Sequence, residues 1–306
     1  MTLRVVSAAG LVLCLAVSSC SGAAETTTRP PRSLPLARTT AGDLRGALAR
    51  LPDVSTDIVS EGGSSITSLI ELRNGKVDIS VPLADVAYLA YAGQLDEISE
   101  PFDQLRGMAV TELSTVHLLT ARGVQAANMG DLKGLRVSLG APGSSTSLIT
   151  PRLLQAHGIS PQDARAERIP NAEMLSKLAS GDVDAAFATY GVPSQEVAAA
   201  IQAGAHLIGI SGPVVEDMRT QYPYLKRTLI VRGTYPNQTD AVHTIGVDVV
   251  LVCRADLDED LVYRLLDAYF ATRPAMTPPN LDRAPATPIP LHPGAARYYR
   301  QRELSR

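Results

Sequence analysis

One pattern occurs twice in this sequence and limits the possible folds more than any other feature. Residues 72–78 and 178–184 both read Leu-x-x-Gly-x-Val-Asp, and each is followed by an apolar run, at 79–83 and at 185–188. The pattern predicts the end of an amphipathic helix, a glycine in the left-handed conformation just past it, and the start of a buried strand. A period this long excludes a solenoid and indicates two α/β units of similar construction.

The segments in front of the two copies also correspond. In the first unit we expect a strand near 34–37, a turn at 38–42, a helix to 51, a strand at 54–59 and a turn at 61–65 that opens the next helix. In the second unit we expect a strand at 135–139, a turn at 140–146, a helix to 157, a strand near 169 and a helix from 171. Because strand and helix alternate in both units, we assign the chain to the α/β class.

The last part of the chain predicts one more strand and one more helix. Residues 245–253 alternate in the manner of a strand, and the acidic run 256–260 suits the positive end of a helix that follows it. Cys253, at the end of that strand, is expected to be a buried small apolar residue. The proline-rich tail from Thr277 is expected to wrap the surface without forming a domain.

The N-terminus predicts export from the cytoplasm. Arg4 precedes an apolar run at 11–17, which is too short to span a bilayer and is typical of a secretory signal. Small residues then lead to Cys20, the arrangement of a lipoprotein signal that is cut before an acylated cysteine, although an ordinary signal with a chance cysteine is the alternative. We therefore predict a signal peptide at 1–19, a flexible tether at 20–32 and a lipid anchor on Cys20.

Charge and motif content exclude several function classes. The net charge of −3 and the absence of a basic block argue against a nucleic-acid partner. The sequence contains no G-x-S-x-G, H-E-x-x-H, C-x-x-C, Walker or G-x-G-x-x-G motif, and its five histidines are scattered. We assign no catalytic residue, metal or cofactor, although a Ser-His-Asp group assembled in space would leave no such trace.

Two turns rich in glycine and hydroxyl groups are the first candidates for a binding site. They lie before predicted helices, where backbone N–H groups and the positive helix end suit a carboxylate. Plain helix capping by serine is the alternative for each turn taken alone. The candidate residues are Gly62, Gly63, Ser64 and Ser65 in the first unit and Gly143, Ser144, Ser145 and Thr146 in the second.

Aromatic residues are few, with ten Tyr, three Phe and no Trp, so each tyrosine is informative. Tyr88 and Tyr91 lie three residues apart on one predicted helical face, where they line a ligand pocket, belong to the core or lie on the surface. Tyr190 and Gly191 follow the predicted strand 185–188, at the edge where open α/β sheets bind ligands.

Four segments together resemble the TAXI family of solute receptors, which serve TRAP transporters. They are Asp85 to Gly93, Asp131 to Thr146, the Gly-Thr-Tyr-Pro-Asn-Gln element at 233–238, and residues 246–257. The resemblance covers about residues 50–272, and Gly-Thr-Tyr-Pro is its most specific element. It implies a two-lobed periplasmic-binding-protein fold, type II-like, with hinge strands at 116–121 and 245–252. The first lobe would be 33–115 plus 253–306 and the second 116–252.

The resemblance also implies a function. The protein would capture a small organic acid or amino acid, such as glutamate or a dicarboxylate, outside the cytoplasm and deliver it to a TRAP permease. Asp85 would belong to the ligand site together with the two turns and the tyrosines.

The sequence departs from the family pattern at the first wall of that site. Family members carry a longer glycine-rich loop with paired tyrosines, where this chain has only Arg38, Thr39, Thr40 and two small residues. We still expect Arg38, Thr39 and Thr40 to belong to the ligand site. A sensor kinase as the partner, and less favourably an envelope hydrolase, stay open as alternatives.

Overall fold

The computed structural model describes residues 32–273 and 282–304. The strands are β1 (Arg32–Ala37), β2 (Val54–Ser60), β3 (Ile79–Ser80), β4 (Leu105–Thr120), β5 (Val137–Ser138), β6 (Ala185–Tyr190), β7 (His206–Ile208), β8 (Leu225–Ile230) and β9 (Val242–Arg254). The helices are α1 (Arg38–Leu48), α2 (Ser65–Arg73), α3 (Ala84–Tyr91), α4 (Ser145–Ala156), α5 (Asn171–Ser180), α6 (Gln195–Gln202), α7 (Pro213–Gln221), α8 (Glu259–Ala271) and α10 (Pro293–Leu304). A short 3-10 helix lies at Met129–Leu132.

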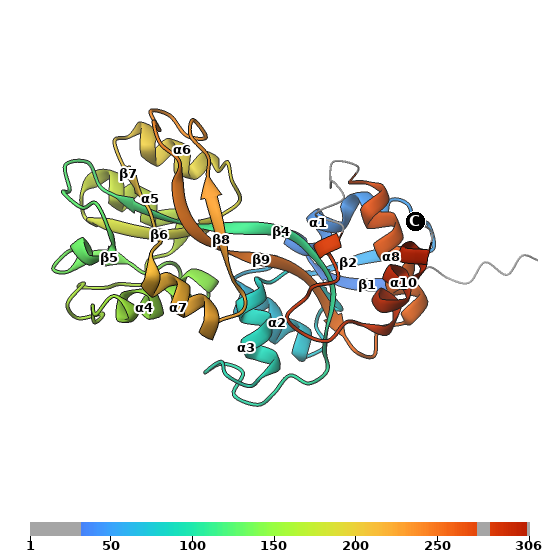
Figure 1. Cartoon of the computed structure of the whole chain (residues 1–306). Helices are drawn as coiled ribbons and strands as arrows, with labels where there is room; N and C mark the ends of the chain where they lie inside the picture. Colours follow the sequence, from blue (N-terminus) through green and yellow to red (C-terminus); the bar gives the residue numbers. More distant parts are fainter. Residues whose placement is uncertain (1–31, 274–281, 305–306) are drawn as a thin grey trace, which may run out of the picture. The chain divides into compact units, whose positions relative to one another are not determined.

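Two long antiparallel strands, β4 and β9, connect the two lobes of this α/β fold (Figure 1). The main sheet has the order β3-β9-β4-β6-β5, with β7 also paired to β4 and β8 to β9. β3 joins β9 near Cys253, whereas β6 joins β4 only from Thr115 onward. The first lobe therefore consists of β1 to β3 with α1 to α3, α8 and α10, and the second consists of β5 to β8 with α4 to α7.

The first lobe holds a parallel β1-β2 pair against three helices. α1 and α10 both contact α8, which begins at the capping residue Asp258. Their apolar faces share one buried cluster with the adjoining halves of β4 and β9, and this cluster includes Leu34, Leu36, Leu44, Met108, Leu251, Leu265, Leu266 and Tyr298.

The repeat predicted from the sequence is present in the structure. Gly75 and Gly181 both have positive φ, 71° and 79°, and each lies between the end of a helix and the following strand. In the first unit the order β1-α1-β2-α2-β3 matches the prediction. The second unit contains β5, α4, α5 and β6 as predicted. The prediction of a strand near Ile169 is wrong, because only an isolated bridge between Ser138 and Glu167 forms there.

Three further predictions need correction. Residues 38–42 are not a turn but the first turn of α1, because β1 runs directly into the helix. The first hinge strand begins at Leu105 rather than at 116, since its N-terminal half pairs with β9 inside the first lobe. The C-terminal tail does not only wrap the surface, because it forms the helix α10. Ala295 and Tyr298 of α10 are buried, and the Tyr298 ring stacks on Phe270 of α8 with centroids 5.7 Å apart.

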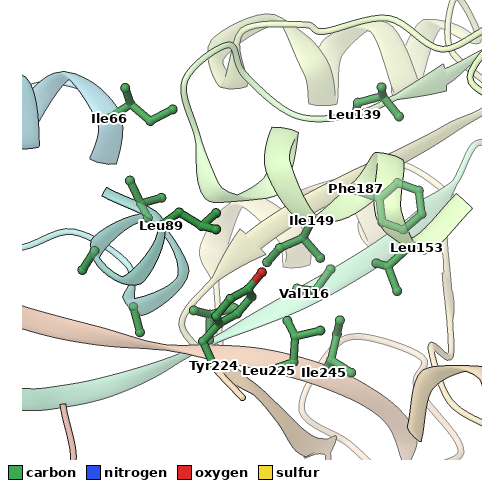
Figure 2. Close-up of a cluster of buried hydrophobic side chains, with 14 of the residues drawn as sticks. Ile66, Leu89, Val116, Leu139, Ile149, Leu153, Phe187, Tyr224, Leu225 and Ile245 are labelled. Atoms are coloured by element: carbon green, nitrogen blue, oxygen red, sulfur yellow. The ribbon is translucent and has the colours of Figure 1, made fainter. Parts of the chain in front are cut away.

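A second apolar cluster runs across the junction between the lobes, as Figure 2 shows. Ile66 and Leu89 come from helices of the first lobe, while Ile149 and Leu153 come from α4 of the second. The hinge strands add side chains such as Val116 and Ile245 to the same cluster. The two lobes therefore share buried apolar surface where they meet.

Several predictions concern residues outside the described part of the chain. The signal peptide, Cys20 and all of the tether except Arg32 lie there, and Arg32 is the first residue of β1. Cys253 is buried and unpaired in β9, as predicted. Of the helices in the described ranges, none combines the length and apolar character that crossing a membrane requires.

Candidate functional site

The two predicted turns meet at the junction between the lobes. The N–H of Ile66, in the first turn of α2, donates to the carbonyl of Gly143 at 3.3 Å. A Cβ atom on Gly143 would lie 2.7 Å from the Ser64 hydroxyl, so this glycine permits the close approach. The fold thus brings together groups that stand far apart in the sequence.

One serine of each turn is a helix cap. The Ser64 hydroxyl accepts from the N–H of Thr67 at 3.3 Å at the start of α2. The Ser144 hydroxyl accepts from the N–H of Ser147 at 3.2 Å at the start of α4. The capping alternative therefore holds for these two residues, and each contributes on the order of 1 kcal/mol to stability.

Ser145 makes a different contact, which crosses the junction. Its hydroxyl donates to Oδ2 of Asp85 at 2.6 Å, and both side chains are buried. Asp85 lies in the first turn of α3, and its other oxygen, Oδ1, has no hydrogen-bond partner. Burial raises the pKa of Asp85 to about 6, although the hydrogen bond from Ser145 and the charge of Arg152 act in the opposite direction.

Thr146 stays within the second lobe. Its hydroxyl donates to the Thr189 hydroxyl at 2.8 Å, which ties α4 to the end of β6. Gly140 supports this packing with a φ of +91°, and a Cβ atom there would lie 2.6 Å from the Thr146 Cβ. The turn before α4 is therefore fixed by buried contacts on its own side of the junction.

Aromatic rings close the junction beside Asp85. Tyr88 of α3 packs against Tyr224 of the second lobe with centroids 5.8 Å apart, and Tyr222 lies 5.7 Å from Tyr224. The Arg152 guanidinium sits 5.6 Å from the Tyr222 centroid. Burial raises the pKa of Tyr224 well above its ordinary value.

Three residues of the junction were not predicted from the sequence: Arg152, Tyr222 and Tyr224. A usable signal existed for the arginine, because Ser145 and Arg152 are seven residues apart and therefore share one face of α4. The two tyrosines precede β8 and carry no local pattern that points to the junction. Tyr91 is half-buried and packs against the same apolar cluster as Tyr88.

A groove with oppositely charged walls lies alongside the junction. It has a volume of about 430 Å³. The second lobe contributes Arg152 and Arg168, and the first lobe contributes Asp96 and Glu97. Gly143 also lines it, so the groove reaches the turn before α4. Such an arrangement can hold a small solute that carries both charges.

The site residues predicted at the start of α1 make other contacts. Arg38 is exposed and pairs with Glu61 at 2.8 Å, and Thr40 is buried within α1. Thr39 packs against Gly62, one residue before Gly63.

Tyr190 ends β6, where it pairs with Thr115 of β4, and Gly191 follows it. Tyr190 is half-buried against the apolar cluster beneath α5 and α6, and Gly191 is exposed. Neither residue contributes to the contacts that join the two lobes through Asp85.

Two observations bear on catalysis and metals. Buried His117 bonds the Tyr235 hydroxyl through Nε2 at 2.8 Å, and burial lowers the pKa of this histidine to about 4. It is thus engaged inside the second lobe and not with a serine of the junction. Within 32–273 and 282–304, no three His, Cys, Asp or Glu side chains are grouped so that they could hold a metal ion.

Comparison with known proteins adds one family and several solved structures. The sequence pattern of the NMT1-like family matches residues 46–302. The aliphatic sulphonate binding protein SsuA of Escherichia coli superposes with a TM-score of 0.50 at 16% identity, over 88% of this chain and 78% of that one. SsuA of Xanthomonas axonopodis pv. citri, bound to MOPS, gives 0.52 at 15% identity, over 88% and 84%.

A third structure has the same architecture. The ligand-binding component of an ABC-type import system from Staphylococcus aureus, with zinc bound, gives a TM-score of 0.50 at 13% identity, over 81% of this chain and 75% of that one. At these identities the likeness establishes the fold, which is that of periplasmic binding proteins.

Proposed function

The chain belongs to the NMT1-like family, and on this premise we propose that it is an extracytoplasmic binding protein that captures a small solute between its two lobes. Two of the compared structures are sulfonate-binding proteins, and the third is the ligand-binding component of an importer. A binding role is consistent with a fold in which two lobes are joined by two strands, because such lobes close around a ligand by a hinge motion.

The observation that carries the proposal is the convergence of polar groups from both lobes on one point. The turn before α4 brings Ser145 to Asp85 of the first lobe, and Tyr88 meets Tyr224 beside them. Ligand sites are concave, largely apolar and contain a few convergent polar groups. The junction has this composition, since the apolar cluster of Ile66 and its neighbours surrounds the polar contacts.

The proposed ligand is a small organic acid or amino acid. Its carboxylate would bind at the first turn of α4, where backbone N–H groups and the helix dipole favour negative charge. Arg152 and Arg168 would add positive charge from the groove that reaches this turn. Arg38, at the first wall of the site, is already paired with Glu61.

The proposed partner is a membrane transporter. The resemblance to TAXI receptors favours a TRAP permease, whereas the Staphylococcus structure belongs to an ABC-type system. Co-purification of the full chain with each permease encoded near its gene would decide between the two types.

The proposed anchor is a lipid on Cys20, after removal of residues 1–19, with lobes at 33–115 plus 253–306 and at 116–252. Cys20→Ala should abolish incorporation of a labelled fatty acid. Equal labelling of the wild-type chain and the variant would contradict the anchor.

A thermal-shift screen tests the binding function. A panel of amino acids, dicarboxylates and alkanesulfonates should contain a solute that, at a hundred times its Kd, stabilises the protein by about 2.7 kcal/mol. Arg152→Gln should weaken that binding by tenfold or more. Arg136→Gln is the matched control, because Arg136 pairs with Asp184 in the second lobe. No stabilising solute in the panel, or equal affinity of Arg152→Gln and wild type, would contradict the proposal.

A further inference from the structure

Asp85 differs from Asp248, the other carboxylate that is buried in the part of the chain that the structure describes. Asp248, 4% exposed, pairs with Arg283 at 2.9 Å and lies near Lys226. Asp85 is 0% exposed, and among the residues that the structure describes no ion pair reaches it. Among the described residues, cations therefore neutralise the buried carboxylate of Asp248, whereas no ion pair neutralises that of Asp85.

The surroundings of Asp85 supply only one hydrogen bond from a side chain. Ser145 donates to Oδ2, and Oδ1 has no partner. Tyr88 packs against Tyr224, which is near enough to Asp85 for their charges to interact, and Arg152 acts on Asp85 through charge without pairing. Removing a carboxylate from water without full pairing is unfavourable, so an incompletely satisfied carboxylate at a junction of two lobes indicates a functional role.

The chemistry of this carboxylate restricts what can approach it. At neutral pH the group is largely ionised, since its pKa of about 6 lies below 7. A second carboxylate beside it would meet like charge at low dielectric, whereas an ammonium group would complete both the charge and the hydrogen bonding of Oδ1.

We propose that Asp85 is the specificity-determining residue of the solute site and that it selects a zwitterionic amino acid over a dicarboxylate. The amino group of the solute donates to Oδ1 of Asp85, and its carboxylate binds the first turn of α4. Ser145, in the first turn of α4, orients the Asp85 carboxylate by donating to Oδ2. This inference rests on the proposed binding function and adds the class of solute.

The test compares each amino acid with the acid that lacks only its amino group. Calorimetry on the full chain would use pairs such as glutamate and glutarate, alanine and propionate, or phenylalanine and 3-phenylpropionate, with alkanesulfonates as a third class. An amino acid should bind wild type more tightly than its deaminated partner by roughly 10- to 100-fold, the range for a charge-assisted hydrogen bond.

Two variants show whether Asp85 causes this preference. Asp85→Asn should lose the preference for the amino group, whereas Asp248→Asn, the matched buried control, should keep the ratio of the two Kd values. The ratio is insensitive to loss of folded protein, so it separates binding from stability.

Each other outcome overturns the inference. If deaminated acids or sulfonates bind as tightly as amino acids, or if Asp85→Asn keeps the preference, then Asp85 does not select the solute and the binding function still stands. If no member of the whole panel binds, both the inference and the proposed function fail together.

Discussion

The turns before α2 and α4 have similar sequences, yet they make different contacts. In the first turn, the Ser65 hydroxyl accepts from the N–H of Leu83 at 3.3 Å and stays within its own lobe. In the second, Ser145 occupies the equivalent position and reaches across to Asp85 in the other lobe. Equivalent sequence positions thus serve local structure in one turn and contact between lobes in the other.

Burial explains why the two turns differ. Thr39, which packs on Gly62 in the first turn, is exposed, while Thr146, which packs on Gly140 in the second, is buried and hydrogen-bonded. Water cannot replace a lost partner at a buried contact. Substitutions in the second turn should therefore lower the free energy of unfolding by more than substitutions in the first. Matched substitutions in the two turns should therefore have unequal effects.

The glycines of the two turns should respond unequally to alanine. Gly140 and Gly62 have nearly the same φ, +91° and +90°, so the conformational strain is shared. At Gly140 the new Cβ would also press on the buried Thr146 Cβ at 2.6 Å, whereas at Gly62 it meets the hydroxyl of exposed Thr39. Gly140→Ala should lower the free energy of unfolding by about 4 kcal/mol and Gly62→Ala by about 2 kcal/mol. Equal losses in urea unfolding would remove the distinction between the turns.

Asp85→Asn should stabilise the solute-free protein at neutral pH. The folded-state pKa of Asp85, about 6, lies above the unfolded value near 3.9. The stability that its protonated form contributes is therefore complete below pH 4 and is lost as pH rises through 6.

The variant stays neutral at every pH, beside the same Arg152, Tyr88 and Tyr224. It should match wild type near pH 4 and exceed it by roughly 3 kcal/mol above pH 7. Unfolding at a series of pH values measures the difference. A variant less stable than wild type at pH 7 would mean that the carboxylate is satisfied by the fold itself.

Replacing Ser65 or Ser145, which occupy equivalent positions in the two turns, by alanine should lower the free energy of unfolding by unequal but smaller amounts. Ser145→Ala removes the donor to Asp85 and leaves a buried carboxylate with neither oxygen bonded by a side chain, a loss of about 2 kcal/mol. Ser65→Ala removes one half-buried bond to Leu83 and should cost about 0.5–1 kcal/mol. A larger loss for Ser65→Ala in the same unfolding experiment would contradict the assignment of Ser65 to local structure and of Ser145 to the contact between lobes.

The capping serines should behave alike. Ser64→Ala and Ser144→Ala each remove one bond to a backbone N–H at a helix start, and each should cost about 1 kcal/mol. Melting curves of the two variants should therefore nearly coincide. A clear difference would show that one of these hydroxyls does more than cap its helix.

The sequence predicted the repeated units and the turns that open α2 and α4, because both depend on local patterns. Helix ends, left-handed glycines and hydroxyl caps are encoded within a few residues, as at Gly75 and Gly181. The features that were not predicted depend on contacts between segments that are distant in the sequence. Tyr224 reaches Tyr88 only through the packing of the lobes, and α10 forms because Tyr298 finds an apolar surface on α8. No local pattern specifies either partner.

A removable cross-link between the lobes tests the central claim, that the solute binds at their junction. A Cβ atom on Gly143 would lie 3.4 Å from the Ser64 Cβ, close to the separation of about 3.5–4.5 Å found in disulfides. The measurement is solute affinity of Ser64→Cys/Gly143→Cys, with Cys14 and Cys20 replaced by alanine, before and after reduction. Any strain at Gly143 is common to both forms. We expect no binding while the lobes are locked and restored binding after reduction. Equal affinity of the two forms would place the solute site elsewhere.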